Sequence, residues 1–573
     1  MQLAIISAMD TTRKINLNTL KTEVEQAGGE VKGTTFPVTI TKGMVAIEVS
    51  EYGYNGTSPI IEYKLTKTNG TKINESDTLS EDSIVINISI SNIKDMEEVT
   101  GIVLKTSSGD EITGTVDLTN GTLTGVPITE NGTYTVTISA TNNEGKDITK
   151  TETIKIKNKI KIANIPDSWE PADDTNAEND WYAYKDATGV TATVNAPKLA
   201  SGMTAIKYVA GTDTATYETL TAGSQWANAM TKDGSMWVWI PRYAYRITNG
   251  YHKSGADLDS SDATKGAGTI EIAFVKYDED TDTNVFLDSS ITGTIKTSGI
   301  ADSDYDESNP SWILAPGFEF GDEHLDGFWF AKFEASNIDG YGSSSSTANN
   351  PDLTLQIKPN VTSWRSITST NIFEVCLKLT SESNYSTYFN KVSNVDTHMT
   401  KNVEWGAVVY LAHSKYGLNG SEIAVKSNGY TTGQGAGNNN YNTTTGITAS
   451  TTKNVYGIYD MSGGAYEYVA ACLTGYTSEL SSNTDSTYIS KYIDVYSSYG
   501  ITKYGDAVYE TSNSSSGTNS WFKDYSYFVD SSGPVFGRGG RCDNGSYAGL
   551  FNFVRDNGVA YDTGGFRVVC AIK

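Results

Sequence analysis

The sequence predicts a multidomain α+β protein in which an N-terminal helix and β modules precede a large irregular head. Three observations support this prediction. The 573 residues are too many for a single hydrophobic core. The apolar residues change from a helical to a two-residue period after about thirty positions, and large aromatic residues gather after position 230. We place a helix at 1–30, a small β unit at 31–78, a β sandwich at 79–158, a loop-rich connector at 159–195 and the head at 196–573.

The first segment predicts one amphipathic helix. Its apolar residues recur at steps of three and four from Leu3 to Ala27, and Gly28-Gly29 supplies a stop signal. The apolar start, Leu3 to Met9, is much shorter than the roughly 20 residues that cross a bilayer, and no export signal is visible. Two explanations of the helix stay open: self-assembly through its apolar stripe, and a resemblance to pilin-like surface proteins.

Alternating apolar and polar residues predict antiparallel strands after the helix. Val38 and Ile40 lie in the small β unit, whereas the alternating runs at 84–90 and 134–138 belong to the sandwich. About seven short strands within 75 residues are typical of an immunoglobulin-like (Ig-like) sandwich. The segment 130–136 resembles bacterial Ig-like domains, which implies a spacer that carries no chemistry of its own.

The head is predicted to contain two helices among its aromatic residues. Asn371 can cap a helix that runs to Leu379, and Thr400 or Asn402 can cap a second helix that ends at Gly417. Further strands are expected at 455–459 and 566–569. The head therefore combines regular elements with long Ser-, Gly- and Asn-rich loops.

The cysteines and histidines lack the spacing of metal sites. The four cysteines, without a CxxC pair, are Cys376, Cys472, Cys542 and Cys570. We expect Cys376 to be a small core residue, and disulfides are not expected to hold the chain together. The four histidines, expected to be surface or half-buried polar residues, are His252, His324, His398 and His413. No metal site is assigned.

The charge and composition exclude some partners and favour a location. Lys and Arg number 43 against 68 Asp and Glu, which gives a net charge of −25. A chain this acidic is repelled by nucleic acid and by anionic membrane surfaces. Its uncharged polar residues and 54 glycines are typical of secreted or surface-displayed proteins.

Two ordered motifs stand out in the head. The first, at 454–468, reads NVYGIYDMSGGAYEY, and the second begins with Arg538-Gly539-Gly540 and continues through 548–549 to 565–569. Further motifs lie upstream at 237–243, 327–334, 358–359 and 363–365. Together they resemble the formylglycine-generating-enzyme (sulfatase-modifying factor) superfamily, a branch of the C-type lectin fold. The resemblance covers about 200–573 and implies that fold for the head.

The resemblance does not imply the superfamily's enzymatic activity. Its oxidase members hold copper with two cysteines after the RGG, but here Cys542 has no partner before Cys570. Iron-type relatives use histidines, and none follows His413. The chain is therefore predicted not to be an enzyme and to need no cofactor. Asp460 and Glu467 either hold a structural Ca²⁺ or bond backbone amides, and we favour the amides because Ca²⁺ takes 6–8 oxygens.

The chain looks more like the variable proteins of diversity-generating retroelements, which use this fold to carry a hypervariable ligand-binding face. In that system a reverse transcriptase mutates template adenines, so Asn-type codons change while a framework persists. The framework here is 538–540, 544–546, 548–551, 557–558 and 565–567, and Asn552 is interpreted as an unchanged template position. The implied face, within the variable segment 535–565, comprises Gly537, Arg541, Cys542, Asp543, Tyr547, Val554, Arg555, Asp556, Val559, Tyr561, Asp562, Thr563 and Gly564.

Tyr547, Arg555 and Tyr561 are the expected anchors of this face, because Tyr and Arg give large contact areas at modest entropic cost. We expect these three and Asp562 to project together into solvent. The residues expected to point inward are Phe551, Phe553 and Phe566, with Tyr525, Tyr527 and Phe528 packed beneath the face as core.

The predicted function is recognition. The chain would be a surface-displayed variable receptor or adhesion protein, extracellular, pilus-like or on a virion, whose partner is a protein or glycan ligand on another cell or particle. Two alternatives remain: an oxidase of the formylglycine-generating type that uses Cys542, and an inert structural pilus or virion subunit. Copper binding that is lost in Cys542→Ser would favour the oxidase.

Overall fold

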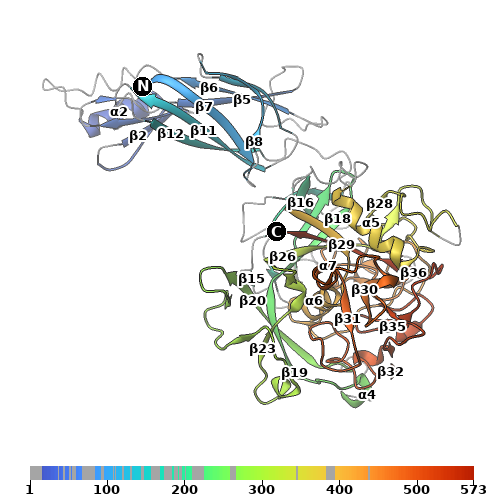
Figure 1. Ribbon diagram of the computed structural model, residues 1–573. Coiled ribbons are helices and arrows are strands. Elements are labelled where there is room, and N and C mark those ends of the chain that lie inside the picture. Colours follow the sequence, from blue (N-terminus) through green and yellow to red (C-terminus); the bar gives the residue numbers. More distant parts are fainter. Residues whose placement is uncertain are drawn as a thin grey trace. The chain divides into compact units, whose positions relative to one another are not determined.

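A computed structural model gives the fold of this chain. It describes residues 16–35, 38–42, 45–50, 53–54, 60–67, 84–91, 96–106, 109, 111–118, 122–128, 132–142, 147–156, 168–172, 184–185, 191–192, 197–200, 202–208, 225–258, 266–342, 346–381, 394–435 and 439–573. The predicted helix before residue 16 and most of the predicted connector lie outside the described residues. The chain divides into two compact units, 1–163 and 164–573 (Figure 1).

The first described element of the first unit is α2 (Leu17–Gln26), which lies within the predicted helix. The Asn16 side chain accepts hydrogen bonds from the amides of Asn18 and Thr19, and this cap explains where the helix begins. A four-stranded antiparallel sheet follows in the order β1 (Glu30–Lys32), β2 (Val38–Lys42), β3 (Val45–Ser50) and β4 (Gly53–Tyr54). Val38 and Ile40 are buried, as their alternation predicts.

Two further four-stranded sheets make up the rest of the described part of the first unit. One has the order β5 (Ile60–Lys67), β6 (Ile84–Ser91), β10 (Thr122–Ile128), β9 (Thr115–Asp117). The other has the order β12 (Asp147–Ile156), β11 (Gly132–Asn142), β7 (Met96–Thr106), β8 (Glu111–Ile112). Residues 60–67, assigned to the small β unit from sequence, thus pair with β6. Leu104 and Val136 are fully buried in one sheet, and Val126 in the other.

A seven-stranded antiparallel sheet joins the start and the end of the second unit. Its order is β13 (Trp169–Pro171), β16 (Met203–Tyr208), β17 (Asn228–Thr231), β18 (Met236–Pro241), β26 (Gly327–Ala331), β37 (Val568–Ile572), β29 (Val395–Met399). The C-terminal strand β37 therefore lies between two strands that come more than 150 residues before it. This placement ties the segment just before β37 to the centre of the unit.

A second sheet carries the predicted variable segment. Its order is β31 (Asp494–Tyr496), β30 (Tyr466–Leu473), β34 (Val535–Arg538), β35 (Phe553–Asp556), β33 (Ser526–Tyr527), β32 (Ser516–Gly517), and β36 (Gly564–Phe566) pairs with β30. A five-stranded sheet has the order β21 (Thr283–Phe286), β20 (Thr269–Asp278), β19 (Tyr243–Asn249), β23 (Trp312–Leu314), β22 (Ile295–Lys296). The short pairs are β14 (Tyr184–Lys185) with β15 (Thr191–Ala192), β24 (Glu319–Phe320) with β25 (Glu323–His324), and β27 (Ser336–Asn337) with β28 (Leu355–Gln356).

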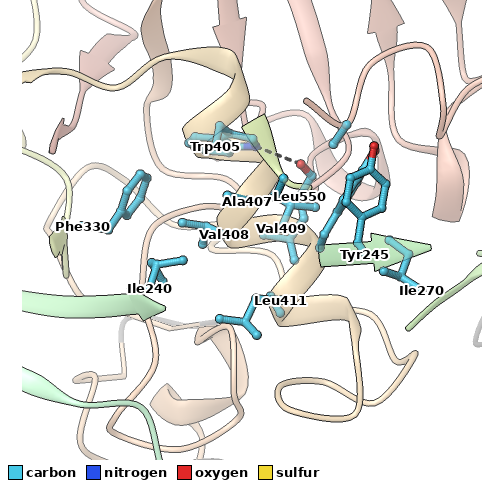
Figure 2. Close-up of a cluster of buried hydrophobic side chains, with 14 of the residues drawn as sticks. Ile240, Tyr245, Ile270, Phe330, Trp405, Ala407, Val408, Val409, Leu411 and Leu550 are labelled. Atoms are coloured by element: carbon cyan, nitrogen blue, oxygen red, sulfur yellow. Dashed lines mark hydrogen bonds between the residues drawn. The ribbon is translucent and has the colours of Figure 1, made fainter. Parts of the chain in front are cut away.

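One helix runs through the core of the second unit. Every residue of α6 (Asn402–His413) is buried, and its Trp405 indole donates to the Leu550 carbonyl at 3.1 Å (Figure 2). Ile240 and Phe330, from β18 and β26, belong to the same hydrophobic cluster. The other helices among the described residues of this unit are α4 (Gly255–Leu258), α5 (Ser369–Ser381), α7 (Ser486–Tyr492) and the short 3-10 helices η3 (Asp302–Tyr305), η4 (Pro316–Phe318), η7 (Gly446–Ala449), η8 (Thr477–Glu479), η9 (Trp521–Lys523) and η10 (Gly545–Tyr547).

The described residues thus form a multidomain, mainly β protein with five α-helices. Both helices predicted in the head exist, but Asn371 lies inside α5, and Lys401 is the N-cap of α6. The Glu404 carboxylate accepts from the Lys401 amide at 2.8 Å, which satisfies that helix end. Helix α6 ends at His413, four residues before the predicted glycine stop.

Two further predictions were wrong. The segment 455–459 forms turns and no strand. His398 and His413 are buried, whereas surface or half-buried positions were expected. His398 is held by carboxylates on both ring nitrogens, and His413 lies among aromatic rings. The expectation that Cys376 is a core residue is confirmed, because it is fully buried.

Candidate functional site

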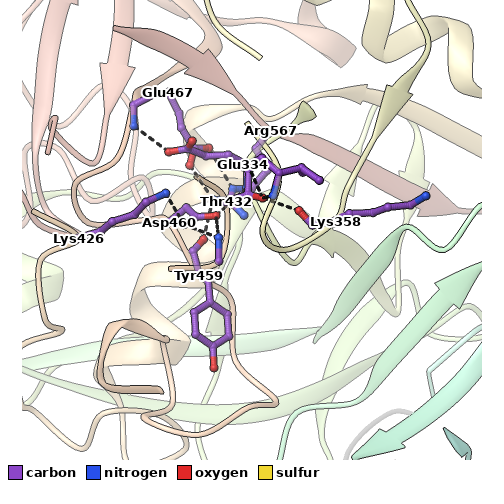
Figure 3. A network of polar contacts seen from close by, with 11 residues as sticks. Glu334, Lys358, Lys426, Thr432, Tyr459, Asp460, Glu467 and Arg567 are labelled. Atoms are coloured by element: carbon purple, nitrogen blue, oxygen red, sulfur yellow. Dashed lines mark hydrogen bonds and ion pairs between the residues drawn. The ribbon is translucent and has the colours of Figure 1, made fainter. Parts of the chain in front are cut away.

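A buried network of charged groups holds the backbone behind the predicted face (Figure 3). The Arg567 guanidinium bonds the Glu467 carboxylate at 2.6 and 3.0 Å, and the Lys426 ammonium lies 2.9 Å from Asp460. Asp460 also accepts from the backbone amides of Gly433 and Glu334. The amide interpretation therefore holds for Asp460, but Glu467 bonds a guanidinium instead.

Burial perturbs the titration of this network. Loss of solvation, only partly offset by the Lys426 ammonium, raises the pKa of Glu334 to about 8. The Glu334 carboxylate accepts from the Ala465 amide at 2.9 Å, and a Cβ at Gly464 would lie 2.7 Å from the same oxygen. Gly464 of the first motif is thus needed where the backbone meets this carboxylate. Within the described residues, no group of three His, Cys, Asp or Glu side chains could hold a metal ion.

The second motif anchors the start of the variable segment. Arg538, at the end of β34, is fully buried and donates to the carbonyls of Asp506 and Ala507 at 3.0 and 3.1 Å. Gly540 follows with a φ of +73°, and a Cβ there would lie 2.7 Å from the Ala548 Cα. Only glycine fits this turn without strain. The residues that point inward, as predicted, are Phe551, Phe553 and Phe566, all 0% exposed.

The structure places most of the predicted face on the surface. Tyr547 is 52% exposed, Tyr561 43% and Val559 42%. Asp543 and Asp562 are also exposed, and the partly exposed face residues are Arg541, Cys542, Val554, Arg555, Asp556 and Thr563. Two face predictions were wrong, because Gly537 and Gly564 are buried. A Cβ at either glycine would lie within 3 Å of a tyrosine ring of β30, so neither position has room for a side chain.

The body of the second unit holds this face mainly by its backbone. The carbonyl of Tyr547 accepts from the Tyr525 amide at 3.0 Å, and the carbonyl of Tyr561 accepts from the Ser366 amide at 2.8 Å. The carbonyl of Thr563 accepts from the Tyr466 amide at 3.1 Å. Three further contacts of this kind are Tyr468 Oη to the Val559 carbonyl, Arg365 to the Asp562 carbonyl, and the Cys542 amide to the Gly464 carbonyl. None of these bonds depends on which side chain occupies the face position.

Some face side chains are nevertheless engaged. Arg555 forms an ion pair with Asp530, and its guanidinium lies 4.1 Å from the centre of the Tyr527 ring. The Asp556 carboxylate lies 2.9 Å from the Tyr466 hydroxyl and 2.6 Å from the Tyr468 hydroxyl. Arg555 and Asp556 are therefore bonded through their side chains, unlike the positions held by backbone groups.

One pocket brings part of the face together. It has a volume of about 330 Å³. Its lining comprises Tyr466, Tyr525, Gly540, Arg541, Asn544, Tyr547, Asn552 and Val554. Three of these, Arg541, Tyr547 and Val554, were predicted face residues, whereas Tyr561 and Asp562 do not line the pocket.

Sequence reasoning missed three tyrosines of this site. Tyr466 lies in the first motif and was read only as part of a family signature. Tyr525 and Tyr527 were expected as core, but both are only half-buried, while Phe528 is 8% exposed. The alternation Tyr525-Ser526-Tyr527 was a usable signal, because a two-residue period places both tyrosines on one face of a strand.

Cys542 lies at the edge of the face. It is half-buried, whereas Cys376, Cys472 and Cys570 are buried. Burial raises the pKa of each of these three thiols. Two available thiolates would be needed for copper, so the residues present do not fit that metal.

Comparison with protein-family models gives no match for this chain, and comparison with curated proteins gives none either. Among the described residues, the helices are too short or too polar to cross a membrane.

Proposed function

We propose that this chain is a surface-displayed ligand-binding protein, a variable receptor or adhesin whose C-terminal segment is diversified by a retroelement. In this proposal the head has a C-type lectin fold of the formylglycine-generating type, and the β5–β6–β10–β9 and β12–β11–β7–β8 sheets of the first unit form an Ig-like spacer. The ligand would be a protein or a glycan on another cell or particle. The motifs at 454–468 and 538–540 and the exposure of the face support the proposal.

The observation that carries the proposal is the way in which the face is attached. Six of its positions, from Cys542 to Thr563, are bonded through backbone groups. The phenylalanines beneath are fully buried. A scaffold of this kind tolerates exchange of the outer side chains, because neither its core nor its backbone bonds change. A catalytic site would instead need particular side chains held in register.

The first test measures this tolerance. Arg541, Tyr547, Val554 and Tyr561 are replaced together by Ser, and the free energy of unfolding is measured. We expect a loss below about 2 kcal/mol, because each of the four surface substitutions should cost up to about 0.5 kcal/mol. Phe553→Ala, the matched control in the same segment, should cost about 3–5 kcal/mol. A quadruple variant as unstable as Phe553→Ala would contradict the proposal.

The second test is genetic. Diversification requires a near-copy of the coding region for 530–570 that differs only at adenines, close to a reverse-transcriptase gene. Finding both supports the proposal. If neighbouring DNA holds neither, the retroelement part fails, and the head is left as a binding module of fixed sequence.

A further inference from the structure

The pocket at the face combines two kinds of residue. Arg541, Tyr547 and Val554 belong to the predicted variable set, whereas Gly540 and Asn552 belong to the predicted framework. In such a pocket the constant base would select one chemical class of ligand. The exchangeable residues at the rim would set how tightly a given ligand of that class binds. This inference rests on the proposed function for the variability of the rim, but the base is described by the structure alone.

The base carries a hydrogen-bond acceptor that none of the described protein groups satisfies. Asn552 is 1% exposed, and its Nδ2 donates to the Tyr547 carbonyl at 2.8 Å. A carbonyl accepts only from a donor, so this bond fixes the orientation of the amide and turns Oδ1 the other way. Within the described residues, Asn552 Oδ1 has no hydrogen-bond partner. A buried acceptor left in this state costs about 1–3 kcal/mol, which a donor on a ligand would recover.

The walls favour an aromatic ligand. Tyr466, Tyr525 and Tyr547 supply three rings, and aromatic pairs prefer the edge-to-face and offset contacts that such walls allow. The Arg541 guanidinium, which is ion-paired with Asp543 at 3.0 Å, lies at the rim and adds a cation beside these rings. Asn544, a further polar side chain of the lining, is engaged through its Oδ1, which accepts from the Arg541 amide at 2.7 Å.

Size selects among aromatic groups. An apolar cavity of about 150 Å³ holds one benzene ring. The pocket, at about 330 Å³, is roughly twice that volume, which suits a fused two-ring system. Among protein side chains, the indole of Trp has this size and is a donor without an acceptor, which matches an unsatisfied amide oxygen.

We propose that this pocket binds a tryptophan side chain of a protein ligand, with the indole N–H donating to Asn552 Oδ1 and the ring lying among the three tyrosines. The conserved part of the recognition would then be made by the framework, and the variable residues would set which tryptophan-bearing surface is accepted. Binding of one exposed tryptophan as a central anchor is a common source of interface affinity.

The test uses indole as the probe and benzothiophene, a ring system of similar shape without an N–H, as its control. Saturation-transfer NMR titrations on the full chain give the two dissociation constants. We expect indole to bind in the millimolar range and benzothiophene to bind roughly tenfold more weakly, the value of one hydrogen bond. Equal affinities, or no binding of indole up to its solubility limit, would overturn the proposal.

Two variants locate the probe. Val554→Trp places a large side chain from a partly exposed strand position into the pocket and should abolish indole binding. Ile338→Ala changes a residue that is 58% exposed and belongs to neither the face nor the pocket lining, and it should leave indole binding unchanged. Indole binding that survives Val554→Trp would also overturn the proposal. These outcomes are independent of the quadruple Ser variant and of the neighbouring DNA. If the pocket does not bind indole, the proposed display function is unaffected, and if the display function is contradicted, indole binding can still be observed.

Discussion

Arg567 and Glu467 form a two-bond ion pair in the centre of the second unit, with Nη2 to Oε1 at 2.6 Å and Nε to Oε2 at 3.0 Å. Neither side chain is more than 1% exposed. Arg567 also donates to the carbonyls of Ala331 and Tyr459 at 2.7 and 2.8 Å. One guanidinium thus joins the terminal strand, the first motif and the strand β26.

Removing one partner of this ion pair should lower the free energy of unfolding by more than the pair as a whole contributes to it. Arg567→Met leaves the Glu467 carboxylate buried without a counter-charge, and we expect a loss of about 3–5 kcal/mol in the free energy of unfolding. The control is Arg246→Met, which breaks the half-exposed pair with Glu271 and should cost less than about 1 kcal/mol. Chemical denaturation of both variants measures the difference, and equal losses would contradict this account.

A substitution in the glycine turn should destabilise the protein more than a substitution on the exposed face. Gly540→Ala forces a Cβ to within 2.7 Å of the Ala548 Cα at a φ of +73°, so we expect a loss of about 1–3 kcal/mol. Tyr547→Ala, seven residues later but 52% exposed, should change stability by less than about 0.5 kcal/mol. Thermal melts of the two variants would test this, and a Gly540→Ala melt like that of the parent chain would show that the turn tolerates a side chain.

Local periodicity explains which elements could be predicted from the sequence. The alternation at Val38 and Ile40 and the helical spacing around α5 and α6 are local signals, and each element is present. The segment 455–459 alternates in the same way but forms no strand. Its carbonyls accept from distant side chains, since Lys332 Nζ bonds Val455 and Gly457, and Arg567 bonds Tyr459. Such tertiary partners leave no local signal.

The candidate site was predictable in outline but not in depth. Exposed and inward positions followed from the motif and its framework, because glycines and phenylalanines mark turns and core. The pocket was not predictable, because Tyr466 in β30 and Tyr525 just before β33 are 59 residues apart in the chain, and the β30–β34–β35–β33 sheet brings them together. The burial of Gly537 and Gly564 was not predictable for the same reason, because the tyrosine rings that leave no room for a Cβ belong to β30, which is distant in the chain.

A buried carboxyl should make the protein less stable towards neutral pH. Glu510 is buried, which raises its pKa to about 7, although the hydroxyls of Tyr245, Tyr305 and Tyr410 at 2.5–2.8 Å oppose the shift. Between the ordinary value of about 4.5 and 7, the folded state keeps a proton that the unfolded state has lost. Stability from this group therefore falls as pH rises through that window, by at most about 1.4 kcal/mol per pH unit.

Glu510→Gln removes this titration while it keeps a side chain of the same size. Unfolding free energies measured from pH 4.5 to 7 should fall less steeply for the variant than for the parent chain. Glu271→Gln, at a half-exposed carboxylate, is the control. Parallel profiles for Glu510→Gln and the parent would mean that Glu510 is ionised throughout the range.

A buried histidine should add a second loss of stability at higher pH. Burial lowers the pKa of His398, but the Glu404 carboxylate at 2.7 Å and the Asp396 carboxylate at 3.2 Å outweigh it and raise the pKa to about 9. The folded state therefore binds this proton more tightly than the unfolded state, whose histidine titrates near 6.5. The contribution of His398 to stability is complete below pH 6.5 and is lost as the pH rises to 9.

NMR of the imidazole protons across pH 6–10 measures the pKa of His398 directly. Glu404→Gln removes the nearer carboxylate and should move the midpoint to lower pH. A midpoint near 6.5 in the parent chain would refute the two-carboxylate description.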